Sequence, residues 1–221
     1  MINPDTLKSV IFDVDGVLFN TEPLHRQAWI LTMADFGYTV SEESLIPWTG
    51  IPCYRLADHY SSTLKPFRPP ELYSSIKQTK LHALLEKELE VFSGVEEMLV
   101  RLKGSVPLGY ATSLIRADIE VMFTVSGLGR YFSAGAVYED VKNHKPDPEV
   151  YLMVAEKLKM PPSLCAAIDD SPSGIKAART AGMLTLGVTN SFPAAELKEA
   201  DLVFESTPAA CRWLLAASRE L

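Results

Sequence analysis

Short apolar runs alternate along most of the chain with longer segments of helical periodicity. The runs cover residues 10–12, 106–111, 134–138, 164–168, 184–188 and 202–204. Runs that are apolar throughout are typical of strands buried on both faces of a parallel sheet. The intervening periodicity predicts helices over residues 115–125, 148–158, 172–181 and 208–217. This alternation predicts an α/β fold with a doubly wound, Rossmann-like parallel sheet.

Two of these helices carry recognisable start signals. Pro148 and Pro172 suit the first helical turn, where the missing N–H group costs nothing. Asp147 and Ser171 precede them, so we expect these two side chains to act as N-caps.

Residues 21–89 interrupt the alternation and contain no convincing strand. Apolar spacing marks two amphipathic helices, one through Leu24, Ala28, Leu31 and Ala34, and one through Leu72, Ile76, Leu81, Leu84 and Leu85. Prolines between them divide shorter helices. We therefore expect an inserted α-helical cap over 21–89 and a core made of 1–20 and 90–221, with connections near residues 20–21 and 92–94.

Composition excludes several classes of protein. The 221 residues are 47% hydrophobic and 22% charged, which is ordinary for a globular chain, and the formal net charge is -7. An acidic chain with no basic run argues against nucleic-acid and membrane partners. Three irregularly spaced cysteines argue against a disulfide framework or a zinc site. With no apolar stretch of spanning length and no leader-like start, we expect a soluble cytoplasmic protein.

Polar side chains follow the predicted strands where ligands bind in open α/β sheets. They are Asp13 and Asp15, then Thr112 and Ser113, then Lys145, and finally Asp169 and Asp170. The carboxylates could hold a hard cation such as Mg²⁺, and the hydroxyls and the lysine could bind phosphate. A carboxylate can also attack phosphorus, and a second one two residues on can act as acid and base.

Each of these signals is weak by itself. An Asp-x-Asp pair is usually a solvated loop, Thr112 and Ser113 could cap a helix, and Asp169 and Asp170 could face the positive end of one. Lys145 by itself is an ordinary loop lysine. The chemical interpretation depends on all four signals occurring in order, each after a predicted strand.

The motifs resemble those of the haloacid dehalogenase superfamily. The first is FDVDGVL at residues 12–18, the second falls at Thr112 and Ser113, the third is KPDP at 145–148, and the fourth is IDDSPSGIKAA at 168–178. The resemblance spans residues 8 to about 190. The helical insert is similar to the small cap of the subfamily that contains β-phosphoglucomutase and many sugar phosphatases.

The resemblance implies a role for each motif residue. Asp13 would be the nucleophile and a metal ligand, and Asp15 the general acid and base with its carbonyl on the metal. Thr112 and its neighbour Ser113 would bind the phosphoryl group, and Lys145 would neutralise it. Asp170 would hold Mg²⁺, with Asp169 beside it, directly or through water.

The stretch 20–29 also resembles that subfamily, with His25 at a hinge position and Glu22 near the site. A histidine at a helix start often only caps or packs, so both readings of His25 stay open. The sequence departs from the mutase at Cys53, where the mutase has a phosphate-binding arginine, and at Arg116, where it has an asparagine. Arg116 could still contact a substrate.

We therefore expect a Mg²⁺-dependent phosphatase that hydrolyses a small phosphorylated metabolite, a sugar phosphate above all, through an aspartyl-phosphate. The alternatives are a phosphosugar mutase and a non-catalytic phosphometabolite-binding protein. We expect a monomer, because a cap must open and close over the site.

Overall fold

The computed structural model describes residues 7–217 and contains one six-stranded sheet. The strands are β1 (Ser9–Phe12), β2 (Leu108–Ala111), β3 (Ala134–Ala136), β4 (Cys165–Asp169), β5 (Leu184–Val188) and β6 (Leu202–Phe204). All pairs are parallel and the order is β3-β2-β1-β4-β5-β6. Every predicted apolar run overlaps one of these strands, so the predicted fold class is confirmed.

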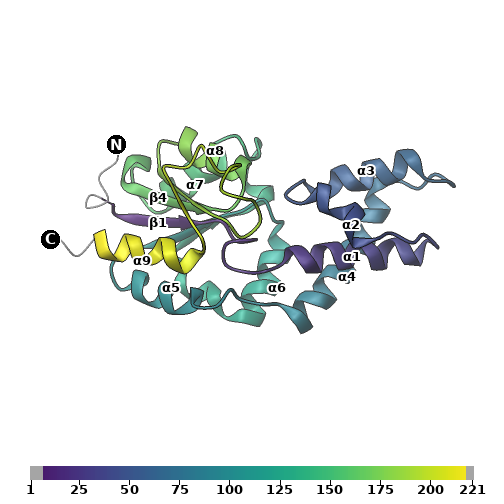
Figure 1. Cartoon of the computed structure of the whole chain (residues 1–221), viewed down its shortest axis with the longest axis horizontal. Helices are drawn as coiled ribbons and strands as arrows, with labels where there is room; N and C mark the ends of the chain where they lie inside the picture. Colours follow the sequence, from purple (N-terminus) through teal and green to yellow (C-terminus); the bar gives the residue numbers. More distant parts are fainter. Residues whose placement is uncertain (1–6, 218–221) are drawn as a thin grey trace. The chain divides into compact units, whose positions relative to one another are not determined.

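Helices cover both faces of the sheet (Figure 1). On one face lie α7 (Glu149–Lys157) and α8 (Pro172–Thr180); on the other lie α5 (Val95–Lys103), α6 (Arg116–Ser126) and α9 (Thr207–Ala217). Single 3₁₀ turns, η3 (Leu128–Tyr131), η4 (Tyr138–Asp140) and η5 (Pro162–Leu164), occupy the connections. The sequence analysis missed α5. Its signal was present, because Val95, Met98, Leu99 and Leu102 recur at helical spacing and are all buried.

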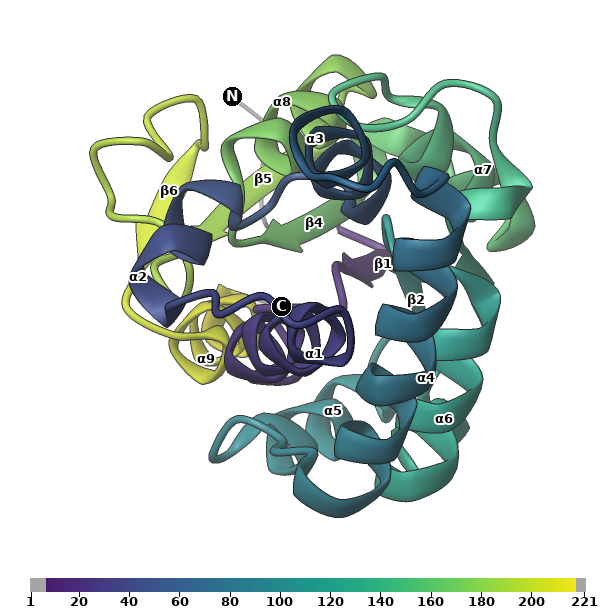
Figure 2. The same ribbon diagram turned by 90° about the vertical axis from the view of Figure 1, so that its right-hand side faces the viewer.

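The central strand β1 sets the register of the site. Phe12 lies opposite Tyr110 on β2 and opposite Ile168 on β4, so the three strands end at the same level. The chain turns in opposite directions on the two sides of β1, since β2 precedes β3 on one side and β4 precedes β5 on the other. Ligands of open α/β sheets bind outside the strand ends at such a switch point. In Figure 2 the β4 arrow lies beside β1, and β5 follows on the far side of β4.

The two predicted N-caps have different outcomes. Ser171 Oγ accepts a hydrogen bond from the Gly174 N–H group at 3.0 Å, so that prediction is confirmed. Asp147 is not the N-cap of α7, because Pro148 holds that position. The Asp147 carboxylate nevertheless accepts the Glu149 N–H group at 3.0 Å, which stabilises the same helix start from one residue earlier.

The chain divides into two compact units, one made of residues up to Asn20 and from Glu90 onward, and one made of Thr21–Leu89. The second unit is entirely helical in the structure: α1 (Glu22–Asp35), α2 (Glu42–Leu45), η2 (Ile46–Trp48), α3 (Cys53–Thr63) and α4 (Pro70–Glu88). Residues 92–94, the expected second connection, belong to the first unit, where Phe92 donates its N–H to the Leu18 carbonyl at 3.1 Å.

Aromatic and aliphatic side chains form the core of the helical unit. Trp29, Met33, Leu45, Leu56 and Tyr73 are buried there. Leu31 and Leu72 were expected on the buried faces, yet each is 38% exposed. The reason is that Trp29 and Met33 on α1, and Tyr73 on α4, supply the larger apolar surfaces, and the helices turn those faces inward. Within residues 7–217 no helix is both long enough and apolar enough to cross a bilayer.

Candidate active site

Three charged side chains from distant parts of the sequence meet at the carboxyl edge of the sheet. The Lys145 ammonium donates to Asp13 Oδ1 at 2.7 Å and to Asp169 Oδ2 at 2.8 Å. Its third hydrogen bond goes to the Ala111 carbonyl at 3.1 Å, at the end of β2. All three acceptors belong to residues at or just after the ends of adjacent strands, so the parallel sheet brings them to one edge. Asp13, Lys145 and Asp169 are called the charged trio below.

Strand pairing places the two carboxylates next to each other. Asp13 directly follows β1, and its N–H group donates to the Ile168 carbonyl at 2.9 Å, which extends the ladder by one residue. Asp169 is the last residue of β4 and is fully buried. Two like charges this close are unfavourable without a cation between them, and Lys145 supplies that cation.

Burial dominates the ionisation of Asp13. The pKa of Asp13 is raised from 3.8 to about 7. Burial is the largest cause, the Lys145 ammonium opposes the rise, and Asp169 adds to it. Burial would lower the pKa of Lys145, but the carboxylates of Asp13 and Asp169 outweigh it and raise that pKa. Lys145 is therefore a permanent cation, and Asp13 titrates near neutral pH while no metal is bound.

Asp170 extends the acidic cluster. It is 5% exposed, and burial together with Asp169 and Asp13 raises the pKa of Asp170 well above its usual value, against a hydrogen bond from Ser191. A Cβ atom on Gly16 would lie 1.8 Å from Asp170 Oδ2, and Gly16 has φ +71°. Only glycine allows the backbone to approach the carboxylate this closely. The Gly16 carbonyl is held in turn by Asn190 Nδ2 at 2.7 Å.

The donor set suits a hard divalent cation. Buried carboxylates that repel one another, faced by a single ammonium, are the ligands that Mg²⁺ prefers. Among residues 7–217 there is no group of three or more His, Cys, Asp or Glu side chains placed to hold one ion. A site made of two carboxylates and a backbone carbonyl does not need such a group.

Asp169 differs from the other carboxylates because protein donors already use both of its oxygens. Oδ1 accepts the N–H and the hydroxyl of Ser171 at 2.9 and 2.8 Å. Oδ2 accepts Lys145 and also the hydroxyl of Tyr151 at 2.6 Å. These contacts make Asp169 a hydrogen-bond acceptor for Lys145 and for the start of α8, and its place beside the metal, directly or through water, stays a prediction.

The remaining motif residues lie at the same edge of the sheet and differ in burial. Asp15 is partly exposed, two residues beyond Asp13. Thr112 is 2% exposed, and its Oγ1 accepts the Leu114 N–H group at 3.1 Å in a local turn. The alternative that the Thr112 and Ser113 hydroxyls cap the next helix is wrong, because the N-cap of α6 is Ile115 and no side chain caps it. Ser113 is exposed. The placement after β2 is as expected, whereas the part these hydroxyls play with phosphate is not decided by these contacts.

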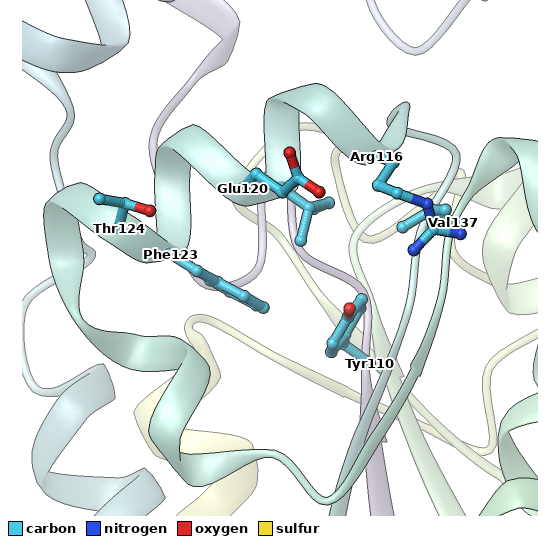
Figure 3. Close-up of a pocket in the computed structure, with 7 residues that line it drawn as sticks. Tyr110, Arg116, Glu120, Phe123, Thr124 and Val137 are labelled. Carbon is cyan, nitrogen blue, oxygen red and sulfur yellow. The ribbon is translucent and has the colours of Figure 1, made fainter.

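Arg116 lies outside the charged trio. Its guanidinium pairs with Asp140, and its N–H group donates to both Glu139 oxygens at 3.1 and 3.0 Å. It borders a cavity of about 390 Å³ on the face of α6. Tyr110 and Phe123 face this cavity, with Glu120 and Arg116 at its edge (Figure 3). The side chain is 52% exposed and already neutralised, which weakens its candidacy as a substrate-binding cation.

The helical unit has a buried polar cluster of its own. Lys77 on α4 is 1% exposed, and its ammonium lies 2.8 Å from His25 Nδ1 on α1. Burial, Lys77 and Arg26 lower the pKa of His25 well below its usual value, so its imidazole is neutral at pH 7. Burial raises the pKa of Glu22, although Arg26 and Lys77 oppose the shift.

The buried position of Lys77 was not predicted from the sequence. Its position four residues after Tyr73 and before Leu81, both fully buried, was the signal that it faces inward. Tyr151 was also missed, although it lies six residues after Lys145 on the buried face of the next helix.

Comparison with known proteins agrees with the motifs. The family model described as haloacid dehalogenase-like hydrolase matches residues 10–188. Fructose-1-phosphate phosphatase YqaB of Escherichia coli is 30% identical over 174 residues, which covers 79% of this chain and 92% of that protein. A phosphorylated carbohydrates phosphatase of Thermotoga maritima is 32% identical over 195 residues, 84% of this chain and 87% of that protein.

Solved structures show the same architecture. A Thermotoga maritima protein assigned as a β-phosphoglucomutase superposes with a TM-score of 0.82 at 28% identity, covering 95% of this chain and 99% of that one. The family model spans most of the chain, and two relatives at 30% identity or more match over most of their length. On this evidence and on the trio at the sheet edge, the chain belongs to the haloacid dehalogenase-like hydrolases and is an enzyme of that family.

Proposed function

We propose that this enzyme is a Mg²⁺-dependent phosphatase that hydrolyses a small sugar phosphate through an aspartyl-phosphate on Asp13. The observation that carries the proposal is the contact between Lys145 Nζ and Asp13 Oδ1 at 2.7 Å, at the switch point of the sheet and beside the buried Asp170. A carboxylate held in one orientation by a permanent cation is prepared to act as a nucleophile.

In the first half-reaction an Asp13 oxygen attacks phosphorus, and the bond between phosphorus and the sugar oxygen breaks. Asp15 donates a proton to the departing sugar oxygen. In the second half-reaction Asp15 takes a proton from water, whose oxygen attacks phosphorus. The bond from phosphorus to Asp13 breaks, inorganic phosphate leaves and the Asp13 carboxylate is restored. Asp15 fits both steps because it is partly exposed and can exchange its proton with solvent.

Asp13, Asp170 and the backbone carbonyl of Asp15 would hold the Mg²⁺ ion. When bound, the ion supplies positive charge for the phosphoryl oxygens and keeps the carboxylates ionised at neutral pH. Asp169 stays outside this ligand set in the proposal, because its four hydrogen bonds hold Lys145 and the first turn of α8.

The substrate class is inferred from the relatives and from the helical unit. Two phosphatases named for fructose 1-phosphate and for phosphorylated carbohydrates match most of the chain. We assign the helical unit the part of a cap, and His25 and Glu22 the part of binding sugar hydroxyls, together with Lys77. Because the Lys77 ammonium donates to His25 Nδ1, the neutral imidazole carries its proton on Nε2, which can donate to a sugar hydroxyl.

A phosphosugar mutase remains the second candidate, because a structural neighbour is assigned as a β-phosphoglucomutase. A mutase needs a cation for the second phosphate. The place that the sequence comparison assigns to that cation holds Cys53, the first residue of α3, which packs against the core of the helical unit. Arg55 is exposed two residues later. Hydrolysis therefore fits this chain better.

Phosphate release from a panel of hexose, pentose and hexitol phosphates tests the proposal. The wild type should release phosphate with Mg²⁺ and stop when the metal is chelated, and Asp13→Asn should lose at least 1,000-fold, a loss of about 4 kcal/mol in transition-state stabilisation. Asp147→Asn is the matched control, since an amide oxygen can still accept the Glu149 N–H group.

Three results would contradict the proposal. Turnover of β-glucose 1-phosphate, with a trace of the bisphosphate, to its 6-phosphate without phosphate release would identify a mutase. Phosphate release by Asp13→Asn at the wild-type rate would show that Asp13 is not the nucleophile. Saturable binding of sugar phosphates without any turnover would favour a binding protein.

A further inference from the structure

Tyr151 brings a buried hydroxyl to the charged trio. It lies on α7, and its side chain is fully buried. Its hydroxyl donates to Asp169 Oδ2 at 2.6 Å, the same oxygen that accepts Lys145 at 2.8 Å. The Lys145 ammonium also lies 4.8 Å from the centre of the Tyr151 ring. Tyr151 therefore contacts both Asp169 and Lys145. Among residues 7–217, no hydrogen bond joins Tyr151 to Asp13.

Both oxygens of the Asp169 carboxylate accept hydrogen bonds from protein donors. Ser171 donates twice to Oδ1, and Tyr151 and Lys145 each donate to Oδ2. A hydroxyl that donates to a carboxylate makes a short, charge-assisted hydrogen bond, stronger than one between neutral groups. Because Tyr151 is carried by a packed helix, it fixes the direction of Oδ2 more firmly than the flexible lysine could.

The direction of Oδ2 matters because each N–H group of the Lys145 ammonium already has an acceptor. An ammonium has three N–H donors, and the three shortest hydrogen bonds of Lys145 go to Asp13, Asp169 and the Ala111 carbonyl. The Tyr151 hydroxyl is a fourth, more distant acceptor at 3.5 Å. If the Asp169 carboxylate rotates, Lys145 must follow it, and the contact with Asp13 lengthens. Small displacements of a group that orients a nucleophile lower the rate strongly.

We propose that Tyr151 is a positioning residue for catalysis: through Asp169 it aims Lys145 at the nucleophile Asp13. The catalytic part of this inference rests on the proposed function. The structural part, that the Tyr151 hydroxyl holds Lys145 in place, stands by itself and has its own readout. The competing explanation is that the hydroxyl merely satisfies a buried polar group, which would affect stability alone.

Tyr151→Phe removes the hydroxyl and keeps the ring. Tyr131→Phe is the matched control in the same unit, because Tyr131 is 8% exposed and its hydroxyl donates to Glu96 Oε1 at 3.0 Å, away from the trio. On the substrate that the wild type turns over, kcat of Tyr151→Phe should fall roughly 10- to 100-fold, the loss expected for one hydrogen bond to a charged group. KM should stay within about twofold, and Tyr131→Phe should leave both constants unchanged.

The second readout follows the Lys145 ammonium without any substrate. In ¹H–¹⁵N NMR spectra tuned to lysine side chains, a buried ammonium with three hydrogen bonds gives a protected signal. Its assignment comes from its disappearance in Lys145→Met. The signal should shift or broaden in Tyr151→Phe and remain in place in Tyr131→Phe.

The two readouts together decide the inference. A changed Lys145 signal with a reduced kcat supports it. An unchanged signal overturns it, whatever happens to kcat, and so does a changed signal with an unchanged kcat. If the wild type turns over none of the substrates, the proposed function fails, and the NMR signal still decides whether Tyr151 positions Lys145.

Discussion

The raised pKa of Asp13 makes a quantitative prediction about stability without metal. A carboxyl whose pKa is about 7 in the folded protein and 3.8 otherwise binds more protons in the folded state between these two pH values. Stability therefore falls as the pH rises through this window and levels off above pH 8. The full window corresponds to about 4 kcal/mol, because each pKa unit is worth about 1.4 kcal/mol. Asp13 is 7% exposed, so solvent screening reduces this figure little.

Asp13→Asn removes the titrating group and keeps its shape. We expect the free energy of unfolding of the variant, relative to the wild type, to increase by about 2 to 3 kcal/mol between pH 5 and pH 8, the part of the window that these limits include. Only the change with pH is predicted, because the amide also alters the hydrogen bond with Lys145 by an amount that does not depend on pH in this range. Asp170 strengthens the trend, since Asp13 raises the pKa of Asp170 in the wild type.

Urea unfolding followed by circular dichroism, with a chelator present, measures both proteins at the two pH values. Adding Mg²⁺ should stabilise the wild type more than Asp13→Asn at pH 8, because the cation favours the ionised carboxylate. Equal pH dependence in the two proteins would refute the reasoning. It would mean that the pKa of Asp13 in the folded protein lies near 3.8, so that the Lys145 ammonium offsets the whole effect of burial.

Three further substitutions test the site. Lys145→Met leaves Asp13 and Asp169 facing each other without their shared cation, so the free energy of unfolding should fall by roughly 3 to 5 kcal/mol at pH 8, with less loss at pH 5, as measured by urea unfolding. Gly16→Ala should abolish Mg²⁺ binding in calorimetry, since its Cβ would lie 1.8 Å from Asp170 Oδ2. Gly182→Ala is the control: at φ +82° and with nothing within 4 Å of the added Cβ, this variant should lose stability alone. Ser171→Ala removes an N-cap and a donor to Asp169, so the melting temperature should drop by an amount equivalent to about 1 to 2 kcal/mol, and an unchanged melting temperature would contradict the cap.

The sequence signals were strongest where local chemistry and position agree. Asp13, Asp169 and Asp170 follow apolar runs that could only be buried strands, and a parallel sheet brings the ends of such strands to one edge. Lys145 was identified because it follows an apolar run and begins the third motif. Arg116 was less informative, because a position at a helix start does not say whether the side chain faces a ligand or an acidic neighbour such as Asp140.

The helical unit shows the limit of periodicity. The spacing of apolar residues placed Leu31 and Leu72 on buried faces and gave no place to Lys77, whereas the fold buries Lys77 and exposes both leucines. The apolar periodicity of α4 is too weak to define one face by itself, and the partner helix decides which side is covered. The contact of Lys77 with His25 joins residues 52 positions apart, so no local pattern could have shown it.

By itself, the sequence determined the fold class, the family and the identity of the acidic residues at the sheet edge. These follow from local order along the chain: which residues are apolar in a row, and which polar residue comes next. The tertiary structure decided which groups each carboxylate contacts. Asp169 and Asp170 are neighbours with the same side chain, and only the fold places Asp169 among Lys145, Tyr151 and Ser171 while it leaves Asp170 against Gly16. Adjacent residues at a strand end point in opposite directions, and what each one meets depends on elements that are remote in sequence.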